Sequence, residues 1–457
     1  MTPLDLIVRG GVVVLPNGIE RLDVGVAEGR VALLGPELAG PAREEVDAGG
    51  LHVLPGMIDA HVHFNEPGRT QWEGWETGTR ALAAGGGTCV VDMPLNAHPP
   101  TIDGASFELK RESAEATALV DFALWGGLVP GRLERLDELA ACGVVGFKAF
   151  MANSGINDFR SVDDLTLYEG MARAAALGRM VAVHAESDAI TRALAARALD
   201  GGRSGVRDYL ASRPVVAELE AISRALVLAE DTGCALHVVH VSTGRGVALV
   251  AAARARGVDA SCETCPHYLV LTEDDVEELG AVAKCAPPLR SPAEGAALWG
   301  AIEDGSLPMV ASDHSPAPAE LKTGTDFFGA WGGISGCQST LELLLTEGHH
   351  GRGLPLAAIA ELLSGFVARR FRLPGKGRLE VGADADLALV ELDAERVLDT
   401  EELLYRHRHS PYVGRRLRGR VRRTIVRGTT VWADGRIVSP PVGRLLTPDA
   451  RERNHRS

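Results

Sequence analysis

Short apolar runs alternate with stretches of helical period through the middle of the chain. Eight of these runs have the length of buried strands, with Ala/Leu/Glu/Arg-rich stretches between them. The runs are GMIDAHVHF (56–64), GTCVVDMP (87–94), DFALWGGLV (121–129), VVGFKAFM (144–151), MVAVHAES (180–187), ALHVVHVS (235–242), VDASCETCPHYL (258–269) and PMVASDH (308–314). Near-continuous apolar strands separated by helices predict a parallel sheet covered on both faces, and eight units predict a closed (β/α)₈ barrel of the TIM type.

The two ends of the chain share a β-like pattern that the middle lacks. Short strands broken by Gly-containing turns fill the first 50 residues, and similar strands return at 382–392 and 423–438. We therefore predict a small composite β-sandwich formed from both termini. The predicted division is 1–50 and 376–443 for the two parts of the sandwich, 51–375 for the barrel, and 444–457 for a polar, frayed tail.

Composition and charge narrow the class of protein. The chain has 457 residues, 46% hydrophobic and 24% charged, as in a folded globular protein. Its formal charge of −14 argues against a nucleic acid or an anionic membrane as partner. No apolar run approaches the roughly 20 residues that span a bilayer, and the N-terminus lacks the features of a signal peptide. Seven cysteines, an odd number, are typical of reduced thiols, so we expect a cytoplasmic protein.

The strongest local motif is the HxH pair of His61 and His63, at the end of the first run. Residues two apart in a strand point to the same face, and barrel enzymes place their sites at the carboxyl ends of strands. Alone, the pair fits two surface histidines equally well. Three further runs end in His184, His240 and Asp313. Imidazole and carboxylate groups at matching strand ends predict a metal site.

Lys148 lies within the fourth apolar run, although lysine is rarely buried without a partner. One interpretation is a buried stem whose ammonium reaches water at the strand end. The other is a carbamate formed with CO₂, which reverses the charge and offers two oxygens to bridge two cations. The metal-competent side chains on the other runs favour the carbamate.

Ordered motifs between residues 50 and 340 resemble those of the cyclic amidohydrolases, in the amidohydrolase superfamily. They are DAHVHFNEPGR, ETGTRALAAGGGTCVVDMPLNAHPPT, GFKAFM, VHAES, HVVHVST, ETCPHYL, KCAPPLR and SDHSPAPAELK. The β-rich ends also fit the composite sandwich of that superfamily. Dihydroorotases and hydantoinases share the metal motifs, so the resemblance indicates the mechanism more firmly than the substrate.

The resemblance implies a binuclear metal centre and a role for each candidate ligand. His61, His63 and Asp313 would hold the more buried ion, and His184 and His240 the second. A carbamylated Lys148 (N6-carboxylysine) and a hydroxide would bridge the two. Zn²⁺ is expected, with Co²⁺, Mn²⁺ or Fe²⁺ as alternatives. Asp313 would also carry the proton of the attacking water to the leaving nitrogen of a cyclic amide. By analogy the family suggests a homotetramer.

Two substitutions separate the chain from dihydroorotases, which carry an Arg after the HxH pair and an Asn in a KxNPPLR segment. Here Asn65 and Ala286 stand at those places, which suits a neutral ureide better than an anionic ring. The HFNEPGR, MPLN and AWGGISG segments resemble allantoinases, which implies that the small-molecule substrate is (S)-allantoin and the product allantoate, in purine catabolism. One departure is Ala317, where allantoinases usually have Cys.

Asn65, Asn96 and Ser315 are the candidate substrate contacts. For Asn96, a turn-stabilising role before the His98-Pro99-Pro100 segment is an equally good interpretation.

The weaker signals have structural interpretations. Cys262 and Cys265 form a CxxC that is better explained by packing than by a metal or redox pair. Glu263 and His267 are candidates either to orient a ligand histidine or to be ordinary surface groups. The arginine-rich stretch 415–427 favours a solvated or subunit-contact strand over a nucleic-acid site.

Two alternative functions stay open. One is another cyclic amidohydrolase, similar to hydantoinases, dihydropyrimidinases or dihydroorotases. The other is a non-catalytic assembly relative, which would be expected to lack metal ligands.

Overall fold

A parallel barrel forms the centre of the computed structural model, which describes residues 4–324 and 326–449. Consecutive strands pair in parallel, β6 to β8 in one sheet and β9 to β13 in another. The strands are β6 (Met57–Val62), β7 (Gly87–Asp92), β8 (Asp121–Leu124), β9 (Gly126–Gly127), β10 (Gly146–Phe150), β11 (Met180–His184), β12 (Leu236–Val238) and β13 (Ala260–Cys262). The third apolar run supplies both β8 and β9, which Trp125 separates.

The eighth run closes the barrel through isolated bridges. Val310 pairs in parallel with Thr264, just after β13, and His314 pairs in parallel with Val62 of β6. The His63 amide also donates to the His314 carbonyl at 2.7 Å. The predicted (β/α)₈ barrel is thereby confirmed, with all eight runs in the expected order.

The seventh run differs from the simple pattern. Its strand is only β13, and the segment CPHYL continues as the short helix α9 (Pro266–Val270). Pro266 occupies the first helical position, where its fixed φ and missing N–H favour a helix start. The apolar run therefore contains a strand and a helix that periodicity alone does not separate.

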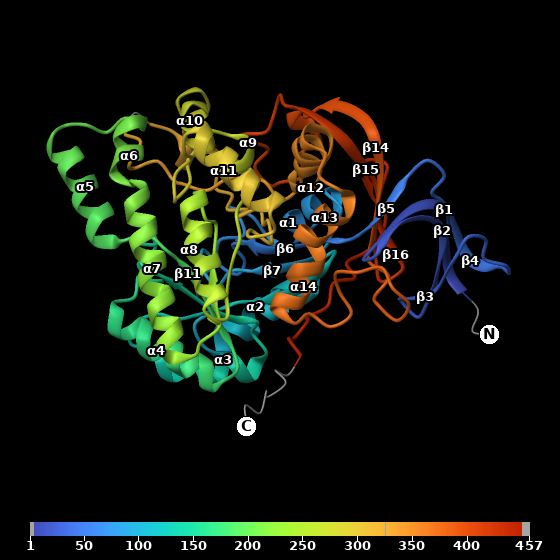
Figure 1. Ribbon diagram of the computed structural model, residues 1–457, viewed down its shortest axis with the longest axis horizontal. Coiled ribbons are helices and arrows are strands. Elements are labelled where there is room, and N and C mark those ends of the chain that lie inside the picture. The colour runs from blue at the N-terminus through green and yellow to red at the C-terminus, as the bar shows by residue number, and fades with distance from the viewer. Residues whose placement is uncertain (1–3, 325, 450–457) are drawn as a thin grey trace.

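Helices cover the barrel (Figure 1). Those that follow the strands include α1 (Trp75–Ala84), α2 (Gly104–Thr117), α3 (Leu136–Cys142), α4 (Asp164–Ala176), α7 (Val215–Thr232), α8 (Gly244–Ala255) and α11 (Pro292–Glu303). The segment 356–371 consists of α13 (Leu356–Ala360), a π-helical turn and α14 (Phe366–Phe371). Further helices are α5 (Asp188–Asp200), α6 (Val206–Ser212), α10 (Glu273–Leu279) and α12 (Thr340–Leu343). Side-chain caps from Asp103, Asp163 and Thr243 start α2, α4 and α8.

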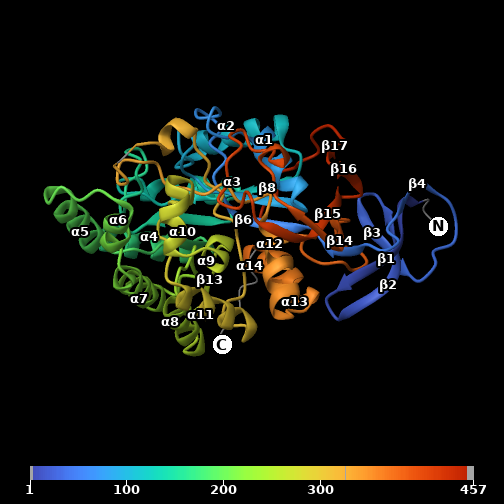
Figure 2. The same cartoon turned by 90° about the horizontal axis from the view of Figure 1, so that it is seen from above.

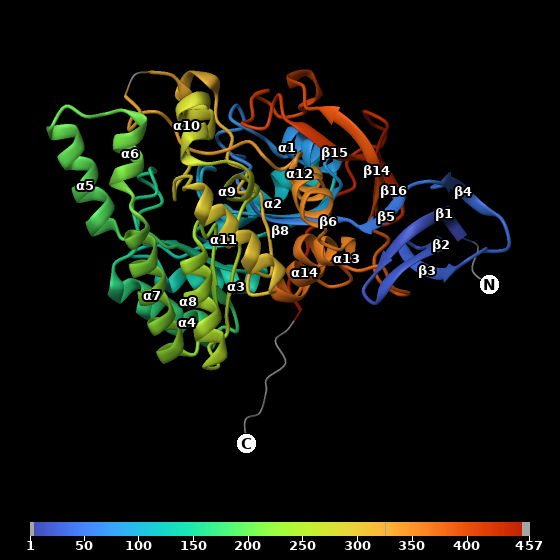
Figure 3. The same ribbon diagram turned by 45° about the horizontal axis from the view of Figure 1, so that its top comes forward.

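Strands from both termini form one nine-stranded sheet beside the barrel. Its strands are β1 (Leu4–Leu15), β2 (Gly18–Ala27), β3 (Arg30–Gly35), β4 (Ala42–Asp47), β5 (His52–Pro55), β14 (Leu387–Val397), β15 (Arg416–Val426), β16 (Thr429–Ala433) and β17 (Arg436–Ile437). Antiparallel pairing of β5 with β14 joins the two ends of the chain, which confirms the composite domain. Figure 2 shows β14 and β15 between the barrel and the N-terminal strands. Figure 3 shows β1–β4 at the opposite end of the molecule from α5 and α6.

The arginine-rich stretch is strand β15, and its side chains pair with acidic residues on and near β14. The pairs are Arg416–Glu395, Arg418–Asp393, Arg420–Glu402 and Arg422–Glu391. This row of cross-strand ion pairs accounts for the arginines within a single chain.

The chain beyond residue 443 continues against the barrel. The Arg444 amide donates to Asp121 Oδ1 at 2.9 Å, and the Leu446 amide donates to the Phe122 carbonyl at 2.7 Å. Residues 450–457, part of the predicted frayed tail, lie outside the described residues. Among the described residues, none of the helices has the length and hydropathy needed to cross a membrane.

A buried ionic cluster fastens the composite sheet to the barrel. Lys376 Nζ lies 2.6 Å from Asp121 Oδ2 at the start of β8, 2.6 Å from Asp386 Oδ2 and 3.0 Å from Asp384 Oδ2. Arg427, at the end of β15, also pairs with Asp121. Burial alone would lower the pKa of Lys376, but the carboxylates raise it, so the lysine stays charged. The three carboxylates lie close enough together to hold a cation, and the ammonium group of Lys376 is that cation.

Lys376→Met is expected to lower the free energy of unfolding by about 3–5 kcal/mol, because it leaves buried carboxylates without their cation. The midpoint of urea unfolding measures this change. Arg378→Met is the matched control, because the exposed Arg378–Glu380 pair should contribute no more than about 0.5 kcal/mol. Equal, small shifts for both variants would contradict a fastening role for Lys376.

Candidate metal centre

The histidines and the aspartate singled out in the sequence meet at the carboxyl end of the barrel. They line one cavity of about 640 Å³. The members are His61, His63, His184, His240 and Asp313. Three strands position the histidines at or just after their carboxyl ends: β6 for His61 and His63, β11 for His184 and β12 for His240. Asp313 comes from the run that closes the barrel.

His61, His63 and Asp313 form the tighter group. Asp313 Oδ1 lies 3.2 Å from His61 Nε2 and 3.4 Å from His63 Nε2. One ligand atom from each of the three residues lies within 4.8 Å of the others, close enough to share one ion. The two imidazoles of the HxH motif therefore reach the same carboxylate oxygen.

His184 and His240 form the second group. His184 Nδ1 lies 3.1 Å from His240 Nε2, and the His184 ring stacks on Phe150 with centroids 4.8 Å apart. The His240 ring centroid is 5.4 Å from that of His61, so the two groups adjoin.

Hydrogen bonds fix which ring nitrogen faces the centre in three of the candidate ligands, His61, His63 and His184. His61 Nδ1 lies 2.5 Å from Glu263 Oε1, His184 Nε2 lies 2.9 Å from Glu186 Oε2, and His63 Nδ1 lies 3.3 Å from the Leu95 carbonyl. An N–H that donates to each of these acceptors leaves the other ring nitrogen with its lone pair toward the centre.

The protonation states suit cation binding. Burial lowers the pKa of His61, His184 and His240, so these imidazoles are neutral near pH 7. Burial alone would raise the pKa of Asp313, but the adjacent imidazoles, His61 foremost, hold it well below its usual range. The donor set thus includes three neutral imidazoles and an ionised carboxylate.

Lys148 is fully buried beside these groups on β10. Its Nζ has no hydrogen-bond partner among the described residues and lies 5.1 Å from the centroid of the Phe150 ring. Burial lowers the pKa of Lys148 to about 8, against the opposing charges of Asp313 and Glu263. A substantial fraction of the amine is therefore neutral near that pH, as reaction with CO₂ requires. A buried amine without a hydrogen-bond partner is uncommon, and it is consistent with a lysine that is modified or that contacts a bound group.

A chain of buried side chains continues from His61 into the barrel interior. Glu263 Oε2 lies 3.0 Å from His237 Nε2, and His237 Nδ1 lies 2.8 Å from Ser261 Oγ. Glu263 thus holds the ring of His61, a candidate ligand, and both Glu263 and His267 are buried rather than surface groups. Sequence reasoning missed His237 and Glu186. Glu186 stands two positions after His184, and that spacing in VHAES was the available signal.

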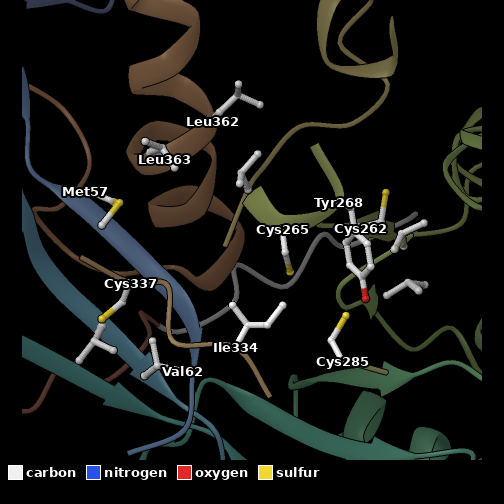
Figure 4. Close-up of a cluster of buried hydrophobic side chains, with 14 of the residues drawn as sticks. Met57, Val62, Cys262, Cys265, Tyr268, Cys285, Ile334, Cys337, Leu362 and Leu363 are labelled. Carbon is white, nitrogen blue, oxygen red and sulfur yellow. The ribbon is translucent and has the colours of Figure 1, made fainter. Parts of the chain in front are cut away.

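His267 and the CxxC cysteines are buried and are not among the described residues that line the cavity. Both ring nitrogens of His267 lack a hydrogen-bond partner among the described residues, and burial lowers its pKa to about 4. Cys262 and Cys265 lie among buried apolar side chains, with Tyr268 and Cys285 nearby (Figure 4). All seven cysteines are free thiols, and burial raises the pKa of Cys262 to about 12. Packing explains this CxxC.

Three residues of the site have left-handed backbone conformations that non-glycine residues rarely adopt. Their φ angles are 71° for Asn96, 41° for His240 and 46° for Asp313. Such strain persists where the surrounding structure holds it, and it is concentrated here at candidate functional positions.

The candidate substrate contacts fall into two groups. Asn96 and Ser315 line the cavity, and Asn96 Nδ2 donates to Ser315 Oγ at 3.4 Å. Asn65 is fully buried, donates to the Pro316 carbonyl at 3.4 Å and is not among the described residues that line the cavity. Ala286 also lines the cavity, whereas Ala317 is buried.

Two lysines that the sequence analysis did not single out, the buried Lys284 and the half-buried Lys322, hold the loop that forms one wall of the cavity. Lys284 Nζ donates to the carbonyls of Phe327 at 2.6 Å and Ala330 at 2.5 Å. Lys322 Nζ donates to the Gly333 carbonyl at 2.6 Å. Phe328 and the residues up to Gly333 line the cavity, so these lysines set the position of its wall.

The sequence profile of the Amidohydrolase family matches residues 52–431. The chain therefore belongs to the amidohydrolase family, and its resemblance to the cyclic amidohydrolases is confirmed. It is similar to the allantoinases of Rubrobacter xylanophilus (63% identity over 456 residues, 100% of both chains) and Deinococcus radiodurans (55% identity, 97% of this chain and 99% of that one). Among solved structures it is similar to the L-hydantoinase (dihydropyrimidinase) from Arthrobacter aurescens, with a TM-score of 0.95 and 36% identity over 97% of this chain and 100% of that one.

Lys284→Met is expected to loosen the cavity wall. Loss of hydrogen bonds from a charged donor should speed amide exchange in 327–333 by about tenfold or more. Hydrogen–deuterium exchange followed by mass spectrometry measures this. Arg352→Met, which removes a cation stacked on Trp299 away from the loop, should leave exchange there unchanged. Unchanged exchange in the Lys284 variant would show that the loop holds its position without the lysine.

Proposed function

We propose that this protein is an allantoinase, which hydrolyses the hydantoin-ring amide of (S)-allantoin to allantoate in purine catabolism. The observation that carries the proposal is its identity of 45–63% to allantoinases over 94–100% of the chain. The cavity supports it, because a cluster of neutral imidazoles and an ionised carboxylate faces a space large enough for a small ring.

The donor set fits two divalent ions. His61, His63 and Asp313 would hold one, His184 and His240 the other, and Lys148 as a carbamate would bridge them. To form the carbamate, the neutral Lys148 amine attacks CO₂, an N–C bond forms, and one proton leaves to solvent. Zn²⁺ is the proposed metal, with Co²⁺, Mn²⁺ or Fe²⁺ as alternatives. Such ions supply a water that is nucleophilic at neutral pH and polarise the scissile carbonyl.

The side chains of this protein supply the remaining steps. Asp313, ionised and at the cavity surface, accepts a proton from the attacking water and returns it to the leaving ring nitrogen. Glu263 and Glu186 hold His61 and His184 in place. Asn96 and Ser315 offer hydrogen bonds to the polar edge of the ureide. Asn65 does not line the cavity; it is buried and donates to the carbonyl of Pro316, the residue after Ser315, and we keep it in the proposal in that place.

The competing functions have weaker support. A non-catalytic relative would be expected to lack ligands, yet all six are present and the five that line the cavity adjoin one another. A hydantoinase-like or dihydroorotase-like activity is tested directly below. A cytoplasmic location and a homotetramer complete the proposal, supported by the free thiols and by analogy with the family respectively.

The substrate is tested with metal-loaded enzyme in bicarbonate buffer. We expect kcat/KM for allantoin to exceed the values for dihydroorotate and hydantoin by about 100-fold or more, because Asn65 and Ala286 stand where dihydroorotases carry Arg and Asn, and because the chain is 45–63% identical to allantoinases. Colorimetric detection of allantoate and ultraviolet assays of the other rings measure this. Asp313→Asn serves as the inactive control. Preferred turnover of dihydroorotate or hydantoin would overturn the substrate assignment.

Lys148→Ala is expected to lose activity by about 1,000-fold or more together with the bound metal, because it removes the bridging carboxylate. Metal analysis and kcat measurements follow the loss, and a short carboxylic acid such as acetate or propionate should restore part of both. Circular dichroism checks that the variant is folded. Full activity in a folded Lys148→Ala protein would exclude the carbamate.

A further inference from the structure

A second cavity, of about 450 Å³, lies at the opposite end of the barrel from the candidate metal centre. Met180 and Ala260, the first residues of β11 and β13, line it, whereas His184 closes β11 at the other end. Its remaining wall comes largely from α14 and the residue that follows it, together with the end of α8. The cavity is therefore separate from the site of the proposed chemistry.

Arginine dominates the lining of this cavity. The side chains are Arg179, Arg254, Arg369, Arg370 and Arg372. The one carboxylate among the described lining residues is Asp259, which pairs with Arg370 at 2.5 Å. Because the whole chain has a formal charge of −14, this local excess of positive charge is not a consequence of composition.

Two of the guanidinium groups have unused donors. The Nε atoms of Arg179 and Arg370 are buried and have no hydrogen-bond partner among the described residues. Arg179 uses Nη2 to donate to the Ala140 carbonyl at 3.2 Å, and Arg370 uses its other nitrogens for Asp259 and the Leu236 carbonyl. These N–H groups add unpaired donors to the positive charge of the lining, so the lining favours an acceptor.

The chemistry of the lining identifies the class of that acceptor. Guanidinium groups bind phosphate and carboxylate through paired N–H donors, and clusters of them recognise multiply charged anions. The volume lies within the range of small-molecule sites and exceeds that of a single inorganic ion. We propose that this cavity binds a small organic anion that carries two phosphate or carboxylate groups on one body.

Isothermal titration calorimetry on the metal-loaded, full-length protein tests the proposal. The probes are fructose 1,6-bisphosphate for phosphate and succinate for carboxylate, with neutral fructose as the blank. Saturable binding of one anion per chain is expected, and the probe that binds more tightly identifies the anionic group. Metal content is measured before and after titration, because heat that accompanies loss of metal would report chelation and count against the proposal.

Variants of exposed arginines place the binding. Arg254→Gln and Arg369→Gln should each weaken binding by about tenfold, the effect of losing one charge-assisted contact. Arg256→Gln is the matched control, since Arg256 is also exposed near the end of α8 but does not line the cavity. Three results would overturn the proposal: no saturable binding of either anion at millimolar concentration, equal weakening by Arg256→Gln, or competition by allantoin.

Discussion

Closure of the barrel is the constraint on which the site depends. The Asp59 carboxylate accepts hydrogen bonds from the Ser312 amide at 3.0 Å and from the His61 amide at 3.3 Å. Ser312 is 253 residues from Asp59 in the sequence, so the first bond joins the last run to the first strand. Burial raises the pKa of Asp59 to about 7, which reflects how completely this junction is removed from water. Because parallel strands align their carboxyl ends, joining the first and last strands also brings the HxH pair to Asp313. His61 and His63 lie in the first strand of the barrel and Asp313 in the last run, so only this junction brings the three side chains together.

Removal from water then sets the chemistry of the cluster. Desolvation keeps the imidazole of His61 neutral and makes the Lys148 amine easier to deprotonate. Burial therefore leaves these nitrogens with the lone pairs that binding a cation, or reacting with CO₂, requires. Glu263 and Glu186 offset part of the desolvation cost of the buried imidazoles, because they accept hydrogen bonds from His61 Nδ1 and His184 Nε2. The left-handed backbone at His240 and Asp313 indicates that the surrounding packing, rather than local preference, fixes these side chains.

The other parts of the molecule support this centre in different ways. Lys376 and Arg427 join the composite sheet to the start of β8 through buried ion pairs, and the β15 arginines hold that sheet together at its surface. At the mouth of the barrel, Lys284 and Lys322 hold a loop by its backbone carbonyls, which leaves the side chains of that loop free to shape the cavity. The arginine-lined cavity occupies the opposite end, where the barrel contributes strand starts rather than strand ends.

The sequence by itself determined the barrel, the composite sheet and the ligand types, because apolar runs, strand periodicity and residue chemistry are local properties. It could predict that His61 and His63 share a face, since that follows from a two-residue repeat. Only the tertiary structure decided that CPHYL turns into helix α9, that Asn65 lies buried behind the cavity wall, and that Lys284 holds a loop more than 40 residues away. These outcomes depend on which distant segments pack together, and long-range packing leaves no periodic signal in a single sequence.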